Sequence, residues 1–268
     1  MITIYNKLAS KYSQLGLFGF IKAVCKAVND VIYYQIVFCK NKVLRHFISL
    51  PHINADLVLS LGPACRPAHY LRELGLRKFS SPFDWMMCYE LKTIINFFEN
   101  GFDLFFKNWE IESTEKGKCW HVRDKDTGML SIHHFDRAYS VDYTYQNFID
   151  KMEKRFKNTI HHIEISRIIC FVTNRAHEKE ALKDFLIHME RIFPGHKFIS
   201  INIITSKNEY FEKIQINNNL EIYNIYFTDI NKDGPNSRAS WLGNVEKWHK
   251  YISCIKLSPP PPKSKKYL

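Results

Sequence analysis

The sequence predicts an α/β protein with a mostly parallel sheet that helices cover on both faces, in a Rossmann-like arrangement of three layers. A continuous apolar run at 168–173 and two mostly apolar segments at 197–204 and 220–227 support this prediction. Such runs are typical of strands buried on both faces, as the strands of parallel sheets are. Helical periodicity follows at 177–192 and again at 240–254. Buried strands that alternate with helices indicate a parallel sheet.

The first predicted strand, 57–61, is mostly apolar and ends at Gly62. Pro67 then lies in the first turn of a predicted helix over 67–74. Cys65 is therefore expected at the mouth of a helix, where unpaired backbone N–H groups and the helix dipole favour an anion. We expect this position to lower the pKa of the Cys65 thiol.

Three further elements are expected between the first helix and the first long apolar run. They are a helix, a β-hairpin insertion and a second helix, at 88–99, around 109–135 and at 143–159. The whole chain is predicted to consist of a basic amphipathic helical extension, a single α/β domain and a disordered basic Pro-rich tail, at 1–50, 55–255 and 256–268.

The 1–50 extension carries seven basic residues and one acid, so it holds more than half of the net charge of +11. Its large apolar residues recur at helical spacing, with lysines mostly between them. Two interpretations stay open: a helix that lies on an anionic membrane surface, or one docked on the domain with its lysines in water. Nucleic acid is a third partner for so basic a chain. We do not expect it, because no nucleic-acid-binding module is recognisable.

Several classes of protein are excluded as first choices. Seven cysteines, an odd number without a Cys-x-x-Cys pair, argue against a zinc site and a disulfide framework. We expect no cofactor and no metal, because phosphate-loop, Gly-x-Gly-x-x-Gly and His-Glu-x-x-His motifs are missing. No signal peptide and no run of about 18 apolar residues is evident. These features predict a cytoplasmic protein, and the 1–50 extension leaves open a peripheral position on the inner face of the membrane.

Four short motifs lie within residues 60–85. They are Ser-Leu-Gly, a cysteine, Gly-Leu-Arg and Pro-Phe-Asp-Trp, at 60–62, Cys65, 75–77 and 82–85. This combination resembles the opening of a bacterial family of papain-like cysteine peptidases whose function is unknown. A weaker similarity follows at 133–135, where the family tends to carry a His two residues before a Phe. The resemblance implies a thiol enzyme that uses Cys65 as nucleophile.

The family name and the strand pattern predict different folds. A papain fold places its cysteine on a long helix and its histidine on an antiparallel sheet. The strand, turn and helix around Cys65 and the buried strands that follow are instead typical of a Rossmann-like sheet. For the architecture we follow the strand pattern.

A cysteine nucleophile needs a base within hydrogen-bond reach and a group that orients this base. His133, His134 and Asp136 supply these residue types in one short segment. Adjacent strand residues face opposite ways, so one of the two histidines at most can face the site. The resemblance favours His133. His134 stands where many relatives carry an acid, so the orienting group stays open, and a solvated His pair is the structural alternative.

Substrate contacts are expected where the parallel strands end, because ligands bind at the carboxyl edge of open α/β sheets. The candidates at this edge are Gly62, Asn174, Arg175 and Asp229. The loop after the Cys65 helix adds Asp84 and Trp85. Asp84 has an equally plausible structural role as the cap of the next helix.

The first functional hypothesis is a cysteine-dependent hydrolase or acyl-transfer enzyme with Cys65 as nucleophile and a histidine base. The alternative is a transferase of bacterial surface-polysaccharide assembly at the membrane face, in which Cys65 is structural. A third is a non-catalytic membrane-associated binding module. The distance from the Cys65 sulfur to the nearest imidazole nitrogen discriminates among them, because more than about 8 Å removes the first mechanism.

Overall fold

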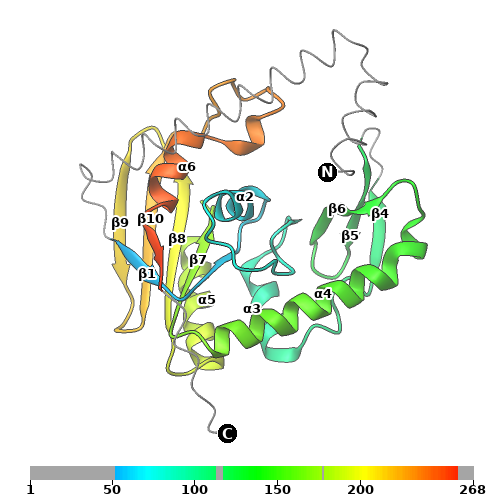
Figure 1. The fold of residues 1–268 in the computed structure, drawn as a ribbon, viewed down its shortest axis with the longest axis horizontal. Coiled ribbons are helices and arrows are strands. Elements are labelled where there is room, and N and C mark those ends of the chain that lie inside the picture. Colours follow the sequence, from blue (N-terminus) through cyan, green and yellow to red (C-terminus); the bar gives the residue numbers. More distant parts are fainter. Residues whose placement is uncertain (1–51, 113–116, 177, 259–268) are drawn as a thin grey trace, which may run out of the picture. The chain divides into compact units, whose positions relative to one another are not determined.

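A computed structural model describes residues 52–112, 117–176 and 178–258, and the strands in these ranges form three sheets (Figure 1). The predicted 1–50 extension lies outside the described residues, as does most of the predicted 256–268 tail. The described helices are α2 to α6, at Arg66–Glu73, Leu91–Asn100, Val141–Glu164, Lys179–Ile192 and Val245–Ile252. Within the described residues, no helix is both long enough and apolar enough to cross a membrane.

The largest sheet has five strands in the order β2-β7-β8-β10-β9. Their bounds are, in that order, Leu57–Ser60, Ile168–Thr173, Lys197–Thr205, Leu220–Phe227 and Tyr210–Gln215. The first four strands are parallel, and β9 pairs with β10 in the antiparallel direction. The four parallel strands match the predicted apolar runs. The β9 strand was not predicted, because it is largely exposed and has no continuous apolar run.

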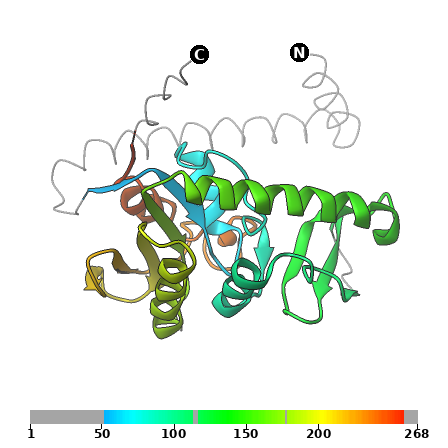
Figure 2. The ribbon, with the colours of Figure 1, turned by 90° about the horizontal axis from the view of Figure 1, so that it is seen from below.

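Helices cover both faces of this sheet (Figure 2). Phe171 of β7 packs against Phe185 of α5, with ring centroids 5.1 Å apart. Phe227 of β10 stacks on Tyr251 of α6 on the other face, with centroids 5.5 Å apart. On α2, Tyr70 joins this second layer, because its ring stacks on Trp248 of α6.

The second sheet is antiparallel, with strands in the order β3-β6-β5-β4. Their bounds are Met86–Met87, Leu130–Asp136, Cys119–Asp124 and Trp109–Glu112. The predicted hairpin insertion around 109–135 is therefore part of a larger sheet, to which the two-residue β3 adds an edge. The long helix α4 then carries the chain from β6 to β7 (Figure 1).

The third sheet pairs two short parallel strands, β1 (Ile53–Ala55) and β11 (Ile255–Leu257). Neither strand was predicted, since three residues are too few to show a periodic pattern.

The α/β class is confirmed, but the description as a mostly parallel, Rossmann-like sheet is corrected by this arrangement. The strands divide among three sheets, and the second of these is wholly antiparallel. Short connections at 125–129 favour antiparallel neighbours, whereas parallel strands need a crossover of a dozen or more residues. The correction concerns how strands pair, which their apolar pattern does not encode.

One hydrophobic core joins the two larger sheets. It contains Leu59 and Leu61 from around β2, Phe135 from β6 and Phe148 from α4, all nearly or fully buried. Phe135 and Phe148 lie with ring centroids 4.6 Å apart. Burying one such side chain stabilises the fold by about 1.5–3 kcal/mol. Because β2 and β6 share this core, it fixes the position of the turn after β2 relative to the side chains of β6.

Candidate active site

The turn after β2 places Cys65 at the start of α2. Cys65 is the N-cap residue of this helix, and Pro67 lies in its first turn as predicted. Gly62 is tightly enclosed: a Cβ there would lie 2.5 Å from Pro67 Cγ and 2.9 Å from Asn174 Oδ1. Contacts this short do not occur between ordinary side chains, so the turn depends on glycine at this position. Gly62 therefore shapes the loop that carries Cys65.

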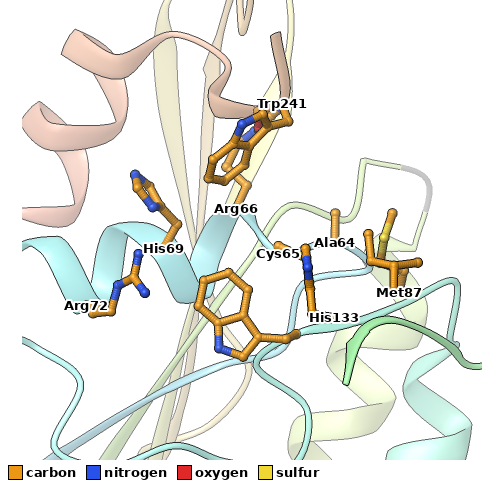
Figure 3. Close-up of a pocket in the computed structure, with 10 residues that line it drawn as sticks. Ala64, Cys65, Arg66, His69, Arg72, Met87, His133 and Trp241 are labelled. Carbon is orange, nitrogen blue, oxygen red and sulfur yellow. The ribbon is translucent and has the colours of Figure 1, made fainter. Parts of the chain in front are cut away.

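His133 approaches this cysteine from the antiparallel sheet, as Figure 3 shows. The Cys65 Sγ and His133 Nε2 atoms lie 3.4 Å apart, although 68 residues separate the two positions in the chain. Cys65 is 8% exposed. The distance is within hydrogen-bond reach for a sulfur atom and far below the limit of about 8 Å set above. The Cys65 thiol is therefore mostly removed from water, whereas His133 beside it is exposed.

The pair opens into a cavity of about 570 Å³. Its walls come from the turn before α2, from α2, from β3 and β6, and from the segment around Trp241. The lining residues are Ala64, Cys65, Arg66, His69, Arg72, Trp85, Met87, Ile132, His133 and Trp241. A cavity of this size suits a small molecule or a short peptide segment.

His134 points away from Cys65, as adjacent strand residues must. Its Nδ1 atom is hydrogen-bonded to Ser131 Oγ at 2.9 Å, and its ring packs near Phe148. Burial, with Arg155 and Lys151 nearby, lowers the pKa of His134 to about 3. This histidine is therefore neutral and part of the core at neutral pH.

Asp136 does not contact His133 in the described residues. Its carboxylate accepts a hydrogen bond from the Ala138 backbone N–H at 2.9 Å, in the turn that follows β6. The side chain is exposed there. The structure thus brings together two of the four predicted catalytic residues, Cys65 and His133.

The two facing groups are both shifted toward their neutral forms. Burial raises the pKa of the Cys65 thiol to about 11, and the backbone N–H of Cys65 offsets only part of this effect. Burial also lowers the pKa of His133, and nearby His121 adds to the shift. The direction for Cys65 is opposite to the one expected from its place at a helix N-terminus, because desolvation outweighs the helix dipole. At neutral pH the pair is a neutral thiol beside a neutral imidazole.

The orientation of His133 depends on an aromatic neighbour. Among the described residues, none forms a hydrogen bond with its Nδ1 atom. Trp85 packs against the imidazole instead, with ring centroids 5.7 Å apart and an interplanar angle of 88°. The Arg72 and Arg77 guanidinium groups lie 5.2 Å and 5.9 Å from the Trp85 ring centre. Such cation–π contacts help to hold the indole in place.

Asp84 holds the loop that carries Trp85 through hydrogen bonds. Its buried carboxylate accepts hydrogen bonds from Ser60 Oγ at 2.7 Å, from Ser81 and from Arg77 Nη1 at 2.9 Å. Burial raises the pKa of Asp84, and the Arg77 charge and the two hydroxyl donors oppose that shift. Asp84 neither lines the cavity nor caps α3, whose N-cap is Glu90. It ties the end of β2 to the loop that carries Trp85.

The predicted residues at the sheet edge hold the framework rather than line the cavity. Arg175 is 2% exposed, donates from Nε to Leu61 O at 3.0 Å and pairs with Glu178. Asn174 lies against Gly62, with its Oδ1 atom buried. The four parallel strands do end at a common edge, as predicted.

Asp229 connects this edge to α2. Its carboxylate accepts hydrogen bonds from Arg66, from the Asn244 backbone N–H at 2.7 Å and from Trp248 Nε1 at 3.0 Å. Arg66 directly follows Cys65 in the chain. Asp229 therefore fixes the first residue of the helix that carries the cysteine.

Several cavity residues were not among the predicted site residues. They are Ala64, Arg66, His69, Arg72, Met87, Ile132 and Trp241. Helical spacing could have indicated two of them, because positions 65, 69 and 72 share one face of a helix. Trp241 is 45% exposed and lines the cavity.

No metal site is visible in the part of the chain that the structure describes, since no three His, Cys, Asp or Glu side chains gather there in positions to hold an ion.

A cysteine at a helix N-terminus in contact with an imidazole, beside a cavity, has the components of a thiol hydrolase site. The chain belongs to the family described as "Putative papain-like cysteine peptidase (DUF1796)", whose profile matches residues 56–207, more than half of the chain. Cys65 and His133 both lie within the matched region. Asp229 and Trp241 lie outside it.

A mimivirus protein shares part of this region. "Uncharacterized protein R408" of Acanthamoeba polyphaga mimivirus is 32% identical over 122 residues, which cover 38% of this chain and 54% of that protein. The chain thus spans about half the length of this relative. No solved structure matches the chain. The bacterial origin suggested by the sequence resemblance stays a prediction.

Proposed function

We propose that this protein is a cysteine-dependent hydrolase in which Cys65 attacks an acyl carbon and His133 is the base. The observation that carries the proposal is the distance of 3.4 Å between Cys65 Sγ and His133 Nε2 at the wall of the cavity. Membership of a family named for cysteine peptidases supports the same reaction class.

The first step transfers one proton. The pKa of Cys65 is raised and that of His133 is lowered, so the resting pair is neutral. As Sγ forms a bond to the substrate carbonyl carbon, its proton moves to His133 Nε2 and the carbonyl π electrons move to oxygen. This is general-base catalysis, as at a serine nucleophile, rather than attack by a preformed thiolate.

The start of α2 supplies donors for the resulting oxyanion. Within the described residues, the backbone N–H groups of Cys65 and Arg66 donate to no other residue, and Pro67 has no N–H group. The positive end of the helix dipole adds to their effect on a negative oxygen. Removal of one such donor costs roughly 10²–10³ in turnover in enzymes of this kind.

The second step releases the products. Protonated His133 donates its proton to the leaving nitrogen or oxygen as the bond from carbon to that atom breaks, which leaves a thioester on Cys65. Water then attacks the thioester with His133 again as base, and the Cys65 thiol is restored. Another nucleophile in place of water would make the enzyme an acyl transferase.

Alkylation with iodoacetamide tests the proposal without a known substrate. In this reaction Sγ displaces iodide and loses its proton, so the rate reports the assistance of the base. We expect His133→Gln to slow alkylation of Cys65 at pH 7.5 by at least about tenfold, the lower range for a lost general base. His188→Gln is the matched control, since His188 is partly exposed on α5 and its Nδ1 contacts Asp184 O of the same helix. Equal alkylation rates of Cys65 in the unchanged protein, in His133→Gln and in His188→Gln would contradict the role of His133 as the base.

No observation on the described residues favours the alternative polysaccharide transferase or the binding module. Their main support, the basic 1–50 extension, lies outside these residues. The membrane surface therefore stays a predicted partner that liposome binding of the full chain would test.

A further inference from the structure

The cavity beside Cys65 has an unbalanced charge. Arg66 and Arg72 line it, and none of the described residues that line it is Asp or Glu. Most of its remaining wall is aromatic or aliphatic. A cavity with cationic groups and no acid favours a negatively charged ligand group.

The two arginines differ in what they already bind. Arg66 is paired with the Asp229 carboxylate and also donates to the Trp241 carbonyl oxygen. The Arg72 guanidinium forms no hydrogen bond or ion pair with any described residue, and it lies over the face of Trp85. Its five donor N–H groups are thus available to a ligand.

The neighbouring acid does not neutralise Arg72. The Glu73 carboxylate lies 3.3 Å from His69 Nε2 and 3.1 Å from His249 Nε2. These histidines lower the pKa of Glu73 to about 2. Glu73 is therefore directed to its own partners, and the positive charge of Arg72, which lines the cavity (Figure 3), is not compensated by the described residues.

The helix sets the distance between this charge and the thiol. Arg72 follows Cys65 by seven positions, which is about two turns of an α-helix and roughly 10 Å along its axis. Both residues line the same cavity. An extended peptide covers this distance with about three residues.

We propose that the site acts on peptide-like acyl groups that carry a carboxylate two to three residues from the scissile carbonyl, and that Arg72 binds this carboxylate. The inference rests on the proposed function. A guanidinium fork matches a carboxylate in two parallel hydrogen bonds. A single unpaired arginine in a largely apolar wall suits one negative charge better than a phosphate, which has more oxygens to satisfy.

Two matched probes test this proposal on the full chain. Chloroacetyl-Gly-Glu amide and chloroacetyl-Gly-Gln amide differ only in the carboxylate. In each case Sγ displaces chloride, a carbon–sulfur bond forms and the thiol proton leaves through His133. We expect the Glu probe to alkylate Cys65 about fivefold faster than the Gln probe at low salt, the upper range for a partly exposed ion pair. The exposed Cys88 serves as an internal reference without this preference.

Arg72→Gln should reduce the preference at Cys65 to the value at Cys88, and Arg72→Lys should restore part of it. Lys92→Gln is the charge-matched control, since Lys92 is 80% exposed, pairs with Glu90 and does not line the cavity. Equal rates for the two probes, or a preference that Arg72→Gln leaves unchanged, would overturn the inference.

A binding measurement separates this outcome from failure of the proposed function. Acetyl-Gly-Glu amide and acetyl-Gly-Gln amide are compared by saturation-transfer NMR on Cys65→Ala, which has no thiol chemistry. Selective binding of the Glu peptide that Arg72→Gln abolishes supports the carboxylate site even where Cys65 proves unreactive. Equal signals from both peptides would contradict the carboxylate site, even where Cys65 proves to be a nucleophile.

Discussion

The indole of Trp85 meets the imidazole of His133 nearly at a right angle, with ring centroids 5.7 Å apart. In many thiol and serine hydrolases a carboxylate or amide orients the base. Here the described residues provide no such partner for Nδ1. Packing against an aromatic ring that Arg72 and Arg77 hold is the arrangement that orients His133.

Trp85→Ala should therefore slow iodoacetamide alkylation of Cys65, by about tenfold, because the imidazole loses its fixed orientation. Trp85→Phe keeps a ring in contact and should retain most of the rate. Water that enters beside His133 in the alanine variant should also raise the pKa of His133 toward its ordinary value. NMR titration of the ring protons measures this pKa. An unchanged titration curve would assign Trp85 to the cavity wall alone.

The pH dependence of Cys65 alkylation follows from the two pKa shifts. Below the lowered pKa of His133 the ring is protonated and cannot accept the thiol proton, so the rate falls. The rate should rise as pH increases through this pKa, which lies below the ordinary 6.5, and then stay level through neutral pH. A second rise should approach pH 11, where the thiol ionises unaided. A preformed thiolate–imidazolium pair would instead remain reactive at pH 5, and such a result would contradict the neutral pair.

His134 should make the fold sensitive to acid. Its pKa is about 3 in the folded chain and near 6.5 when unfolded, so the unfolded chain binds the proton more readily. The stability it contributes is complete above pH 6.5 and is lost as pH falls toward 3, by up to about 1.4 kcal/mol per pH unit. His134→Gln should flatten the pH dependence of the unfolding free energy by this amount. The unfolding free energy of both proteins is measured by urea denaturation at several pH values. The same pH dependence in both would contradict this role of His134.

Gly62→Ala should disturb the turn that carries Cys65. The added methyl group would overlap Pro67 and Asn174, which we expect to cost about 1–3 kcal/mol in unfolding free energy. The displaced cysteine should also react more slowly with iodoacetamide. Gly75→Ala is the control: its positive φ strains the backbone, but nothing lies within 4 Å of the new methyl group. It should lower stability without slowing alkylation of Cys65.

Cys65→Ser should abolish turnover of any acyl substrate, because a serine hydroxyl is far less nucleophilic at this site. The melting temperature should change by only a few degrees, because serine is a near-isostere of cysteine. Cys88→Ser is the control for a cysteine outside the cavity. Until a substrate is known, rescue of a deletion phenotype serves as the assay. Full rescue by the Cys65→Ser allele would end the cysteine-enzyme interpretation.

Local sequence determined the elements around Cys65 well. Pro67 and the apolar run at 57–61 predict a strand, a turn and a helix, and the structure has β2 and α2 there. The buried strands β7, β8 and β10 were also predictable, because a strand covered on both faces is mostly apolar. These signals work because each depends on residues that are close in the chain.

Only the tertiary structure decided what Cys65 meets. His133 reaches it because β6 pairs with β3 and β5 in a sheet that shares its core with β2, and apolar periodicity does not encode which elements pair. The same packing removes water from the thiol and reverses the expected direction of its pKa. It also leaves Arg72 unpaired, because Glu73 binds histidines instead. Desolvation and charge pairing depend on residues that are distant in the chain. They are therefore established only when folding brings these residues together.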